Sequence, residues 1–204
     1  MNVFPTKCTY VVLAIFFSLT CFLFAQESTS INCGTITSPE SIEYYNSLKS
    51  QIKKYEQEFM LKKQSKTKLG KVINSIPIKA HIIRASNGSG GLSISDLNNA
   101  ISHINSIYAD AYMEFFLCDG INYINDDKLC HFKKGDENAL TETNNVAGLI
   151  NIYFTDYIKN NEEESICGYS DNVAKNDVIV MKSSCATNNS SLAHELGHFF
   201  SLVH

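Results

Sequence analysis

The sequence predicts an α/β or α+β domain in which helices pack on a mostly parallel, twisted sheet. Three observations predict this class. Four segments after residue 74 have the alternating or continuously apolar pattern of strands, an amphipathic helical segment follows the first of them, and a second helical segment follows the last. Strands and helices in this order form layers, so we expect a backing helix and a final helix to cover the sheet.

The first predicted strand lies at residues 76–82. Isoleucine and alanine side chains alternate along it with Pro77, Lys79 and His81. This alternation indicates a strand with one buried face, and the proline places its start near an edge or a first position. The stretch 87–91, Asn-Gly-Ser-Gly-Gly, has the composition of a turn or loop.

A helix is predicted to begin after Ser93. Serine is a favoured N-cap, Asp96 stands three residues later, and Leu92 and Leu97 are spaced to form a hydrophobic staple. The helix then carries an apolar stripe that requires a sheet to cover it. The members of the stripe are Leu97, Ile101, Ile104, Tyr108 and Ala111.

Three more strands and one upstream helix are predicted. Residues 113–117, 149–155 and 177–181 are short, largely apolar runs, as expected for buried strands. Residues 41–66 predict a helix, because apolar side chains recur every three or four positions between Ile42 and Phe59.

Composition excludes one class of partner. The chain has 204 residues, of which 44% are hydrophobic, and its formal net charge is -4. A chain of this composition can form a packed core, but it has no basic excess with which to neutralise phosphates. We therefore expect no nucleic-acid partner. The sequence predicts no oligomeric state.

The N-terminus predicts export. Lys7 precedes an almost entirely apolar run from Tyr10 to Phe24, and Ala25 provides a small residue for cleavage. This pattern is typical of a signal peptide at residues 1–25. The alternative is a membrane anchor, but the run has about 15 residues where a spanning helix needs ~20. We expect a secreted protein with no stable membrane span after cleavage.

Residues 26–74 are predicted to be a pro-segment or linker before the domain at residues 75–204. Residues 26–40 are polar and hydroxyl-rich, and the predicted helix at 41–66 follows. A basic run at 62–68 ends the segment. This run is interpreted either as a solvated linker or as a processing site between a pro-segment and an enzyme.

The strongest chemical signal lies in residues 191–204. His194 and His198 are four residues apart, so on a helix both imidazoles project from one face and can ligate one zinc ion. Glu195 is rotated by about 100° from His194 and stands beside the metal rather than on it. This is the position of a general base that acts on zinc-bound water.

His204 is a candidate third ligand. It lies six residues after His198, where a continuous helix would carry it away from the ligand face. The helix must therefore end near Ser201 for the third imidazole to turn back. Three nitrogens would then leave a fourth position open for water, as in catalytic zinc sites. A core helix with packed histidines is the alternative, but three buried imidazoles would each need a polar partner.

The motif resembles that of the metzincin zinc metallopeptidases, His-Glu-x-x-His-x-x-Gly-x-x-His. His194, Glu195, His198 and His204 match it, whereas Ser201 stands where the family has glycine. Glycine there permits a left-handed turn, and a residue with a Cβ costs about 1–2 kcal/mol.

The preceding chain is similar to secreted bacterial members of the pappalysin family. The similar segments are Cys167-Gly168-Tyr169, residues 177–181, Ser184-Cys185-Ala186 and residues 192–198. The resemblance covers residues 75–204. It implies endopeptidase activity on proteins or peptides, and a sheet whose antiparallel edge strand accepts substrate by strand addition. It also implies a methionine-containing turn and a lower half of the cleft, which we expect to lie beyond His204.

Cysteine use predicts disulfides. Removing residues 1–25 leaves five of the seven cysteines, and in an oxidising compartment four of them would pair. Four cysteines allow three connectivities. Proximity along the chain favours Cys118 with Cys130 and Cys167 with Cys185, which leaves Cys33.

The family resemblance implies a use for Cys33. Cys33-Gly34-Thr35 looks like the pro-segment motif with which some members block their zinc, a thiolate taking the fourth position and excluding water. The alternative is an ordinary disulfide to a cysteine outside this chain.

Calcium is a further candidate ion, but the sequence offers no full set of ligands for it. The pairs Asp126-Asp127 and Asp136-Glu137 carry suitable oxygens, but loop carboxylates without a full ligand series are usually solvated. The sequence thus predicts a secreted zinc endopeptidase precursor. The alternatives are a zinc-binding module without catalysis and a metal-free structural domain.

Overall fold

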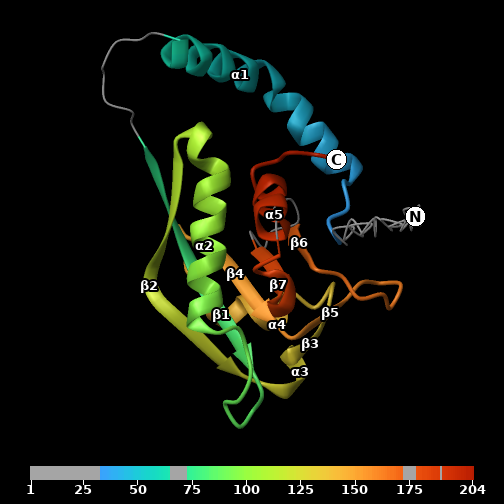
Figure 1. The fold of residues 1–204 in the computed structure, drawn as a ribbon. Helices are drawn as coiled ribbons and strands as arrows, with labels where there is room; N and C mark the ends of the chain where they lie inside the picture. Colours follow the sequence, from blue (N-terminus) through green and yellow to red (C-terminus); the bar gives the residue numbers. More distant parts are fainter. Residues whose placement is uncertain (1–32, 65–72, 172–177, 189) are drawn as a thin grey trace, which may run out of the picture. The chain divides into compact units, whose positions relative to one another are not determined.

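The computed structural model describes residues 33–64, 73–171, 178–188 and 190–204. The predicted signal peptide, and the part of the basic run that follows Gln64, lie outside the described residues. In chain order (Figure 1) the elements are α1 (Pro39–Gln64), β1 (Asn74–Arg84), α2 (Ile94–Tyr108), the 3-10 helix η1 (Ala109–Ala111), β2 (Met113–Asn125), α3 (Asp127–Cys130), β3 (His131–Lys133), α4 (Asn138–Asn144), β4 (Ile150–Thr155), β5 (Tyr157–Lys159), β6 (Gly168–Asp171), β7 (Val178–Lys182), the 3-10 helix η2 (Ser183–Cys185) and α5 (Ser191–Phe199).

The main sheet has five strands in the order β2-β1-β4-β7-β6. The first four strands run parallel, and β6 pairs antiparallel with β7 at the edge. The predicted class is therefore confirmed, with a mostly parallel sheet and one antiparallel edge strand. A second, two-stranded parallel sheet is formed by β3 and β5.

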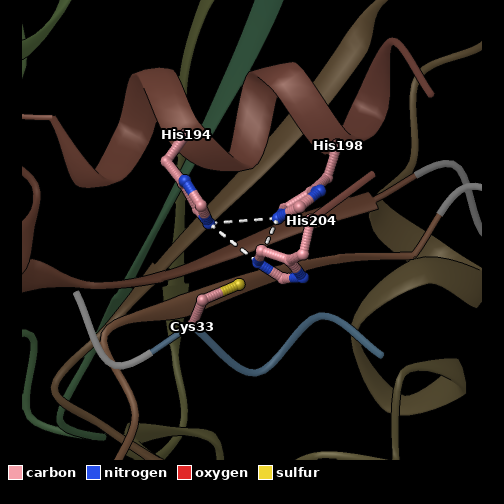
Figure 2. Close-up of side chains that lie close together, drawn as sticks. All are labelled: Cys33, His194, His198 and His204. Carbon is pink, nitrogen blue, oxygen red and sulfur yellow. Dashed lines mark hydrogen bonds between the residues drawn. The ribbon is translucent and has the colours of Figure 1, made fainter. Parts of the chain in front are cut away.

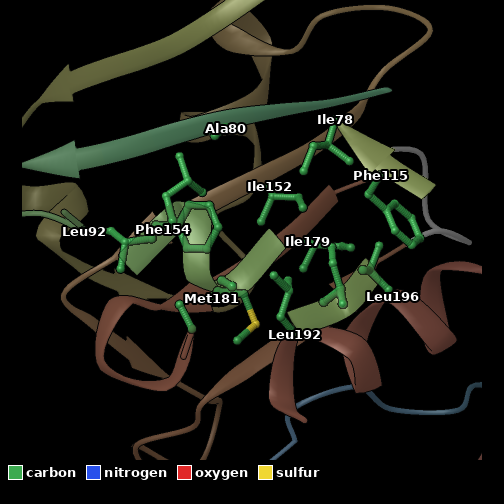
Figure 3. Packing of buried hydrophobic residues seen from close by; sticks show 14 of the residues in the cluster. Ile78, Ala80, Leu92, Phe115, Ile152, Phe154, Ile179, Met181, Leu192 and Leu196 are labelled. Carbon is green, nitrogen blue, oxygen red and sulfur yellow. The ribbon is translucent and has the colours of Figure 1, made fainter. Parts of the chain in front are cut away.

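One face of the main sheet is covered by α2 and α5 (Figure 1). Side chains from both helices and from β1, β4 and β7 form a single apolar cluster (Figure 3). Ile152 and Phe154 of β4 point into this cluster, whereas Tyr153 between them belongs to the other face. This alternation follows from the two-residue period of a strand. The cluster packs α5, the predicted active-site helix, against β7, which is the last strand of the sheet along the chain.

The opposite face buries a second apolar cluster. It joins the central strands to the smaller sheet and to α4, through residues such as Phe132, Leu140 and Ile158. Because both faces are covered, most positions of the central strands are buried, and β4 is buried along its whole length.

The predicted start of α2 is confirmed in detail. Ser93 is the N-cap, and its Oγ accepts a hydrogen bond from the Asp96 backbone N–H at 3.0 Å. Ser93 Oγ in turn donates to the Asp96 carboxylate at 2.8 Å, so the two side chains are linked directly at the start of the helix. Leu97, Ala100 and Ile104 supply the buried stripe.

The second strand is longer than the sequence predicts. The predicted strand covers residues 113–117 and stops before Cys118-Asp119-Gly120. In the structure β2 continues to Asn125 through a register shift opposite Ile78 and Ala80. Asp119 and Gly120 both have positive φ there, so the turn-forming residues produce a bulge within the strand.

The upstream helix α1 is confirmed, and it begins at Pro39. Apolar side chains remain exposed on it, including Ile42 at 47% and Tyr55 at 59%. The Phe59 ring lies 5.4 Å from that of Tyr112, centroid to centroid. No helix among the described residues is both long and apolar enough to cross a membrane.

One predicted disulfide is present and the other is wrong. Cys167 and Cys185 are bonded, whereas Cys118 and Cys130 are both free thiols. Cys118 lies on β2, and extended strand separates it from Cys130. At ~3.3 Å per residue this strand holds the two Cα atoms roughly 20 Å apart, far beyond the ~7 Å that a disulfide spans. Pairing by proximity along the chain gives the wrong result here because β2 continues through Cys118 without turning back.

Candidate metal centre

The helix α5 brings two of the predicted ligands together. His194 and His198 lie one turn apart, and their Nε2 atoms are 3.0 Å from each other. Leu192 and Leu196 on the other side of the helix are buried in the core. The Tyr108 hydroxyl of α2 donates to the Ala193 carbonyl oxygen at 2.9 Å. Core packing and this hydrogen bond therefore set the direction in which both imidazoles point.

The chain reverses directly after α5. The Ser201 N–H donates to the His198 carbonyl at 2.8 Å, and the Leu202 N–H donates to the Gly197 carbonyl at 2.9 Å. These two bonds define a Schellman motif, in which one residue adopts the left-handed conformation. That residue is Ser201, with φ of 67°. Serine thus takes the conformation for which the metzincin motif has glycine, and the helix ends where the prediction requires.

The reversal places His204 beside the other two imidazoles (Figure 2). Its Nε2 lies 3.1 Å from that of His198 and 3.3 Å from that of His194. The His198 Nδ1 lies 2.7 Å from the Leu202 carbonyl oxygen. Because a carbonyl only accepts, Nδ1 carries the proton and Nε2 presents a lone pair toward the other rings.

The three nitrogens fit a tetrahedral zinc ion. Zinc–nitrogen bonds of ~2.0–2.1 Å in tetrahedral geometry place ligand nitrogens about 3.3 Å apart. The observed separations of 3.0, 3.1 and 3.3 Å are close to this value. Burial lowers the pKa of His194 and of His198, which favours the neutral imidazole that binds metal. A site that gathers three imidazole nitrogens without a cation would bring lone pairs together unfavourably.

Glu195 lies beside the histidines and is buried. Its Oε1 atom has no hydrogen-bond partner among the described residues. Burial raises the pKa of Glu195 to about 7. The helix can approach β6 closely here because residue 168 is glycine. A Cβ on Gly168 would lie 3.0 Å from the Val180 carbonyl oxygen and 3.3 Å from Cγ of Glu195.

Cys33 completes the cluster. Its Sγ and the three imidazole nitrogens all lie within 4.8 Å of one another (Figure 2), and they form the only candidate metal group among the described residues. Burial, and then the charge of Glu195, raise the pKa of Cys33 to about 11. At neutral pH the thiol therefore keeps its proton unless a cation stands beside it.

The residues after Cys33 follow the edge strand. Cys33 forms a parallel bridge with Gly168, and the Gly34 N–H donates to the Gly168 carbonyl at 2.8 Å. The Thr35 hydroxyl accepts from the Ser170 N–H at 2.9 Å. The segment 33–35 therefore occupies the outer edge of β6 and passes directly in front of the histidines.

Two side chains of the site make contacts that the sequence does not indicate. Thr35 donates to Oε2 of Glu195 at 3.0 Å. The Lys134 ammonium group donates to the Gly34 carbonyl oxygen and lies 5.0 Å from the centroid of the Tyr169 ring. No spacing rule connects residues 35 and 134 with residues 169 and 195. Only the edge position of β6, which the resemblance alone implied, could have pointed to them.

Two of the carboxylates considered for calcium bind other groups of the protein. Asp126 caps α3 by accepting from Lys128 N and Leu129 N. Glu137 is buried and accepts from Tyr169 Oη at 2.7 Å and from Gly135 N at 2.9 Å. These contacts explain both side chains structurally.

Sequence comparison assigns no family. No family model matches the chain, and no curated protein matches it. The fold, however, is similar to that of solved structures.

A promirolysin mutant from Tannerella forsythia has a TM-score of 0.52 at 19% sequence identity, and the match covers 85% of this chain and 69% of that chain. Metalloproteinase II from Bacteroides fragilis has a TM-score of 0.43 at 14% identity, covering 65% of this chain and 46% of that chain. The first likeness shows that the chain shares the fold of promirolysin. The TM-score of the second match is too low to support an argument.

Proposed function

We propose that the protein is a secreted zinc-dependent endopeptidase, produced as a latent precursor. The observation that carries the proposal is the convergence of three Nε2 atoms, from His194, His198 and His204, within 3.3 Å of one another. Together with the metzincin-like fold, this donor set favours one zinc ion. Its substrates would be proteins or peptides that lie extended along β6.

The residues divide the chemistry between them. The three histidines hold the ion, which when bound supplies Lewis acidity and an activated water. Glu195 acts as the general base, because its carboxylate stands beside the ligands without being one of them. It takes the proton of the attacking water and returns it to the departing amine nitrogen. The buried, unpartnered Oε1 atom is a polar group that substrate or water would satisfy.

Cys33 keeps the precursor latent. Its Sγ lies within 4.8 Å of all three imidazole nitrogens, where a thiolate can take the fourth zinc position. The segment that carries it covers β6, so water and substrate are excluded together. Removal of this segment would open the site. Secretion is supported by the signal-peptide pattern and by the Cys167–Cys185 disulfide, since disulfides persist in oxidising compartments.

The test uses the full-length natural protein after removal of the pro-segment. Glu195→Gln keeps the three ligands, and Glu142→Gln, at an exposed position on α4, is the matched control. We expect each protein to bind one zinc ion. We expect Glu195→Gln to lower kcat for peptide hydrolysis by about 10²–10⁴-fold, and Glu142→Gln to leave it unchanged.

Three results would overturn parts of the proposal. Wild-type turnover in Glu195→Gln would show that another group is the base. One zinc ion without hydrolysis in the wild type would identify a zinc-binding module that is not an enzyme. Absence of zinc from every preparation would favour a metal-free structural domain.

A further inference from the structure

The outer edge of β6 is a backbone-binding surface that is already occupied. Gly168 accepts a hydrogen bond from the Gly34 N–H at 2.8 Å, and the Ser170 N–H donates to Thr35 Oγ1 at 2.9 Å. The inner edge of β6 pairs with β7. Any extended chain that reaches the histidines along β6 must use the same outward groups. The segment Cys33–Thr35 therefore shows where a bound polypeptide backbone lies.

A third group, from outside β6, also holds this backbone. The Lys134 ammonium, on the loop after β3, donates a hydrogen bond to the Gly34 carbonyl oxygen. The bond is charge-assisted, and such bonds are roughly twice as strong as neutral ones. Lys134 is half-buried, so its side chain covers the segment rather than extending into solvent.

The ammonium is held in place by β6 itself. It lies 5.0 Å from the centroid of the Tyr169 ring, and that tyrosine is fully buried. The Tyr169 hydroxyl donates to Oε1 of Glu137 at 2.7 Å, and the Gly135 N–H donates to the same oxygen at 2.9 Å. These bonds fix the loop that carries Lys134 to the strand on which the segment lies. None of them involves residues 33–35, so the ammonium is positioned independently of the segment.

The partner of Lys134 is main chain and not side chain. A Cβ added to Gly34 would lie 2.2 Å from Cδ1 of Ile166, so this position of the segment has no room for a side chain without a shift. The negative charges that act on Lys134 include Glu137, Asp171 and Glu195. With carboxylates already nearby, the ammonium gives no added preference for acidic peptides. Its contact is with a carbonyl oxygen, which every peptide has.

We propose that Lys134 is a backbone-binding residue of the cleft, whose ammonium holds a carbonyl oxygen of any extended polypeptide lying along β6. In the latent chain this oxygen belongs to Gly34. In the active enzyme it belongs to a substrate residue, an extension that rests on the proposed peptidase function. Lys134 thus contributes to latency and to substrate affinity through the same contact, and its contribution is independent of substrate sequence.

The first experiment needs neither metal nor activity. The full chain, freed of metal with a chelator, is alkylated with iodoacetamide, and mass spectrometry follows the peptide that carries Cys33. Lys134→Met should raise the alkylation rate of Cys33 about tenfold, equivalent to ~1.4 kcal/mol. Lys134→Arg should keep the slow alkylation rate of the wild type, because arginine can also donate to the carbonyl oxygen. Lys133→Met is the matched control, since Lys133 is exposed and pairs with Glu163. Equal rates in wild type and Lys134→Met would overturn the contact with the segment.

The second experiment uses the enzyme after removal of the pro-segment, with one acidic and one basic peptide substrate. Lys134→Met should raise KM about tenfold for both peptides and leave kcat within twofold, because the lost contact is present in ground state and transition state alike. An unchanged KM would overturn the substrate role. A change of KM for only one peptide would show that Lys134 recognises substrate side chains, which would overturn a backbone contact. If the wild type hydrolyses nothing, the proposed function fails, while the alkylation result still decides the contact.

Discussion

The Thr35 hydroxyl donates a hydrogen bond to Oε2 of Glu195 across 3.0 Å, and it accepts another from the Ser170 N–H. One side chain of the predicted pro-segment therefore contacts both the candidate general base and the edge of the sheet that we propose binds substrate. The Cys33 thiol of the same segment lies beside the three imidazole nitrogens and also beside Glu195.

Thr35→Val should loosen this contact. Valine has a similar shape but neither donates nor accepts, so the Ser170 N–H loses its acceptor. A typical hydrogen bond contributes ~1 kcal/mol, and we expect amide hydrogen exchange in the peptide that spans β6 to become about five- to tenfold faster. Thr35→Ser should retain most of the protection. Thr37→Val, two residues along the same segment, serves as control. Unchanged exchange in Thr35→Val would show that the segment does not depend on this hydroxyl.

Ser201→Gly should stabilise the chain. Ser201 has φ of 67°, a left-handed conformation that glycine adopts without the steric cost of a Cβ. We expect the free energy of unfolding to rise by about 1 kcal/mol, measured by chemical denaturation. The same substitution at Ser102, exposed in the middle of α2, should lower it by about 0.5 kcal/mol. A loss of stability in Ser201→Gly would mean that serine does more at this turn than tolerate its conformation.

Acid should destabilise the fold through His81. This histidine is fully buried on β1, with Nε2 3.0 Å from Asn151 Oδ1 and Nδ1 3.1 Å from Asn122 Nδ2. The neutral ring satisfies both, donating from Nε2 and accepting at Nδ1. Burial, and also the charge of Lys79, lower the pKa of His81 below its usual 6.5.

The direction of the effect follows from proton linkage. Below pH 6.5 the unfolded chain takes up a proton that folded His81 does not, so the free energy of unfolding falls as the pH decreases toward the lowered pKa. Above pH 6.5 the contribution is complete. Denaturation of metal-free protein between pH 7.5 and 5, values chosen around this ~6.5 reference, should show a shallower slope in His81→Gln than in the wild type. His103→Gln, exposed on α2, should keep the wild-type slope. Identical slopes in all three proteins would contradict the assignment.

The sequence was most informative where a local pattern determines the structure. The N-cap at Ser93 and the strand at 149–155 depend on neighbouring residues, and both were predicted within one residue of their observed bounds. The spacing of His194 and His198 was informative for the same reason, since helical geometry alone brings these two side chains together, and zinc binding by them stays a prediction. At Cys118-Asp119-Gly120 a local rule failed, because pairing with β1 converts turn residues into a bulge.

Contacts between distant segments could not be predicted in this way. Lys134 carries no pattern that distinguishes it from ordinary loop residues, and neither the motif that contains Thr35 nor the acidic pair that contains Glu137 indicates the contacts these residues make. They meet at the site because β6 lies at the edge of the sheet and both the segment 33–35 and the loop after β3 pack on it. The order of strands in a sheet depends on the whole fold, and it does not follow from the local patterns of a single sequence.

Zinc ligation by three histidines and Cys33 is tested by X-ray absorption at the zinc edge of the full-length latent protein, after loading with one equivalent of zinc. We expect one ion with three imidazole nitrogens at ~2.0 Å and one sulfur at ~2.3 Å, and we expect Cys33→Ser to remove only the sulfur. An ion bound without the His204 imidazole, or a protein that retains no zinc, would contradict this ligation.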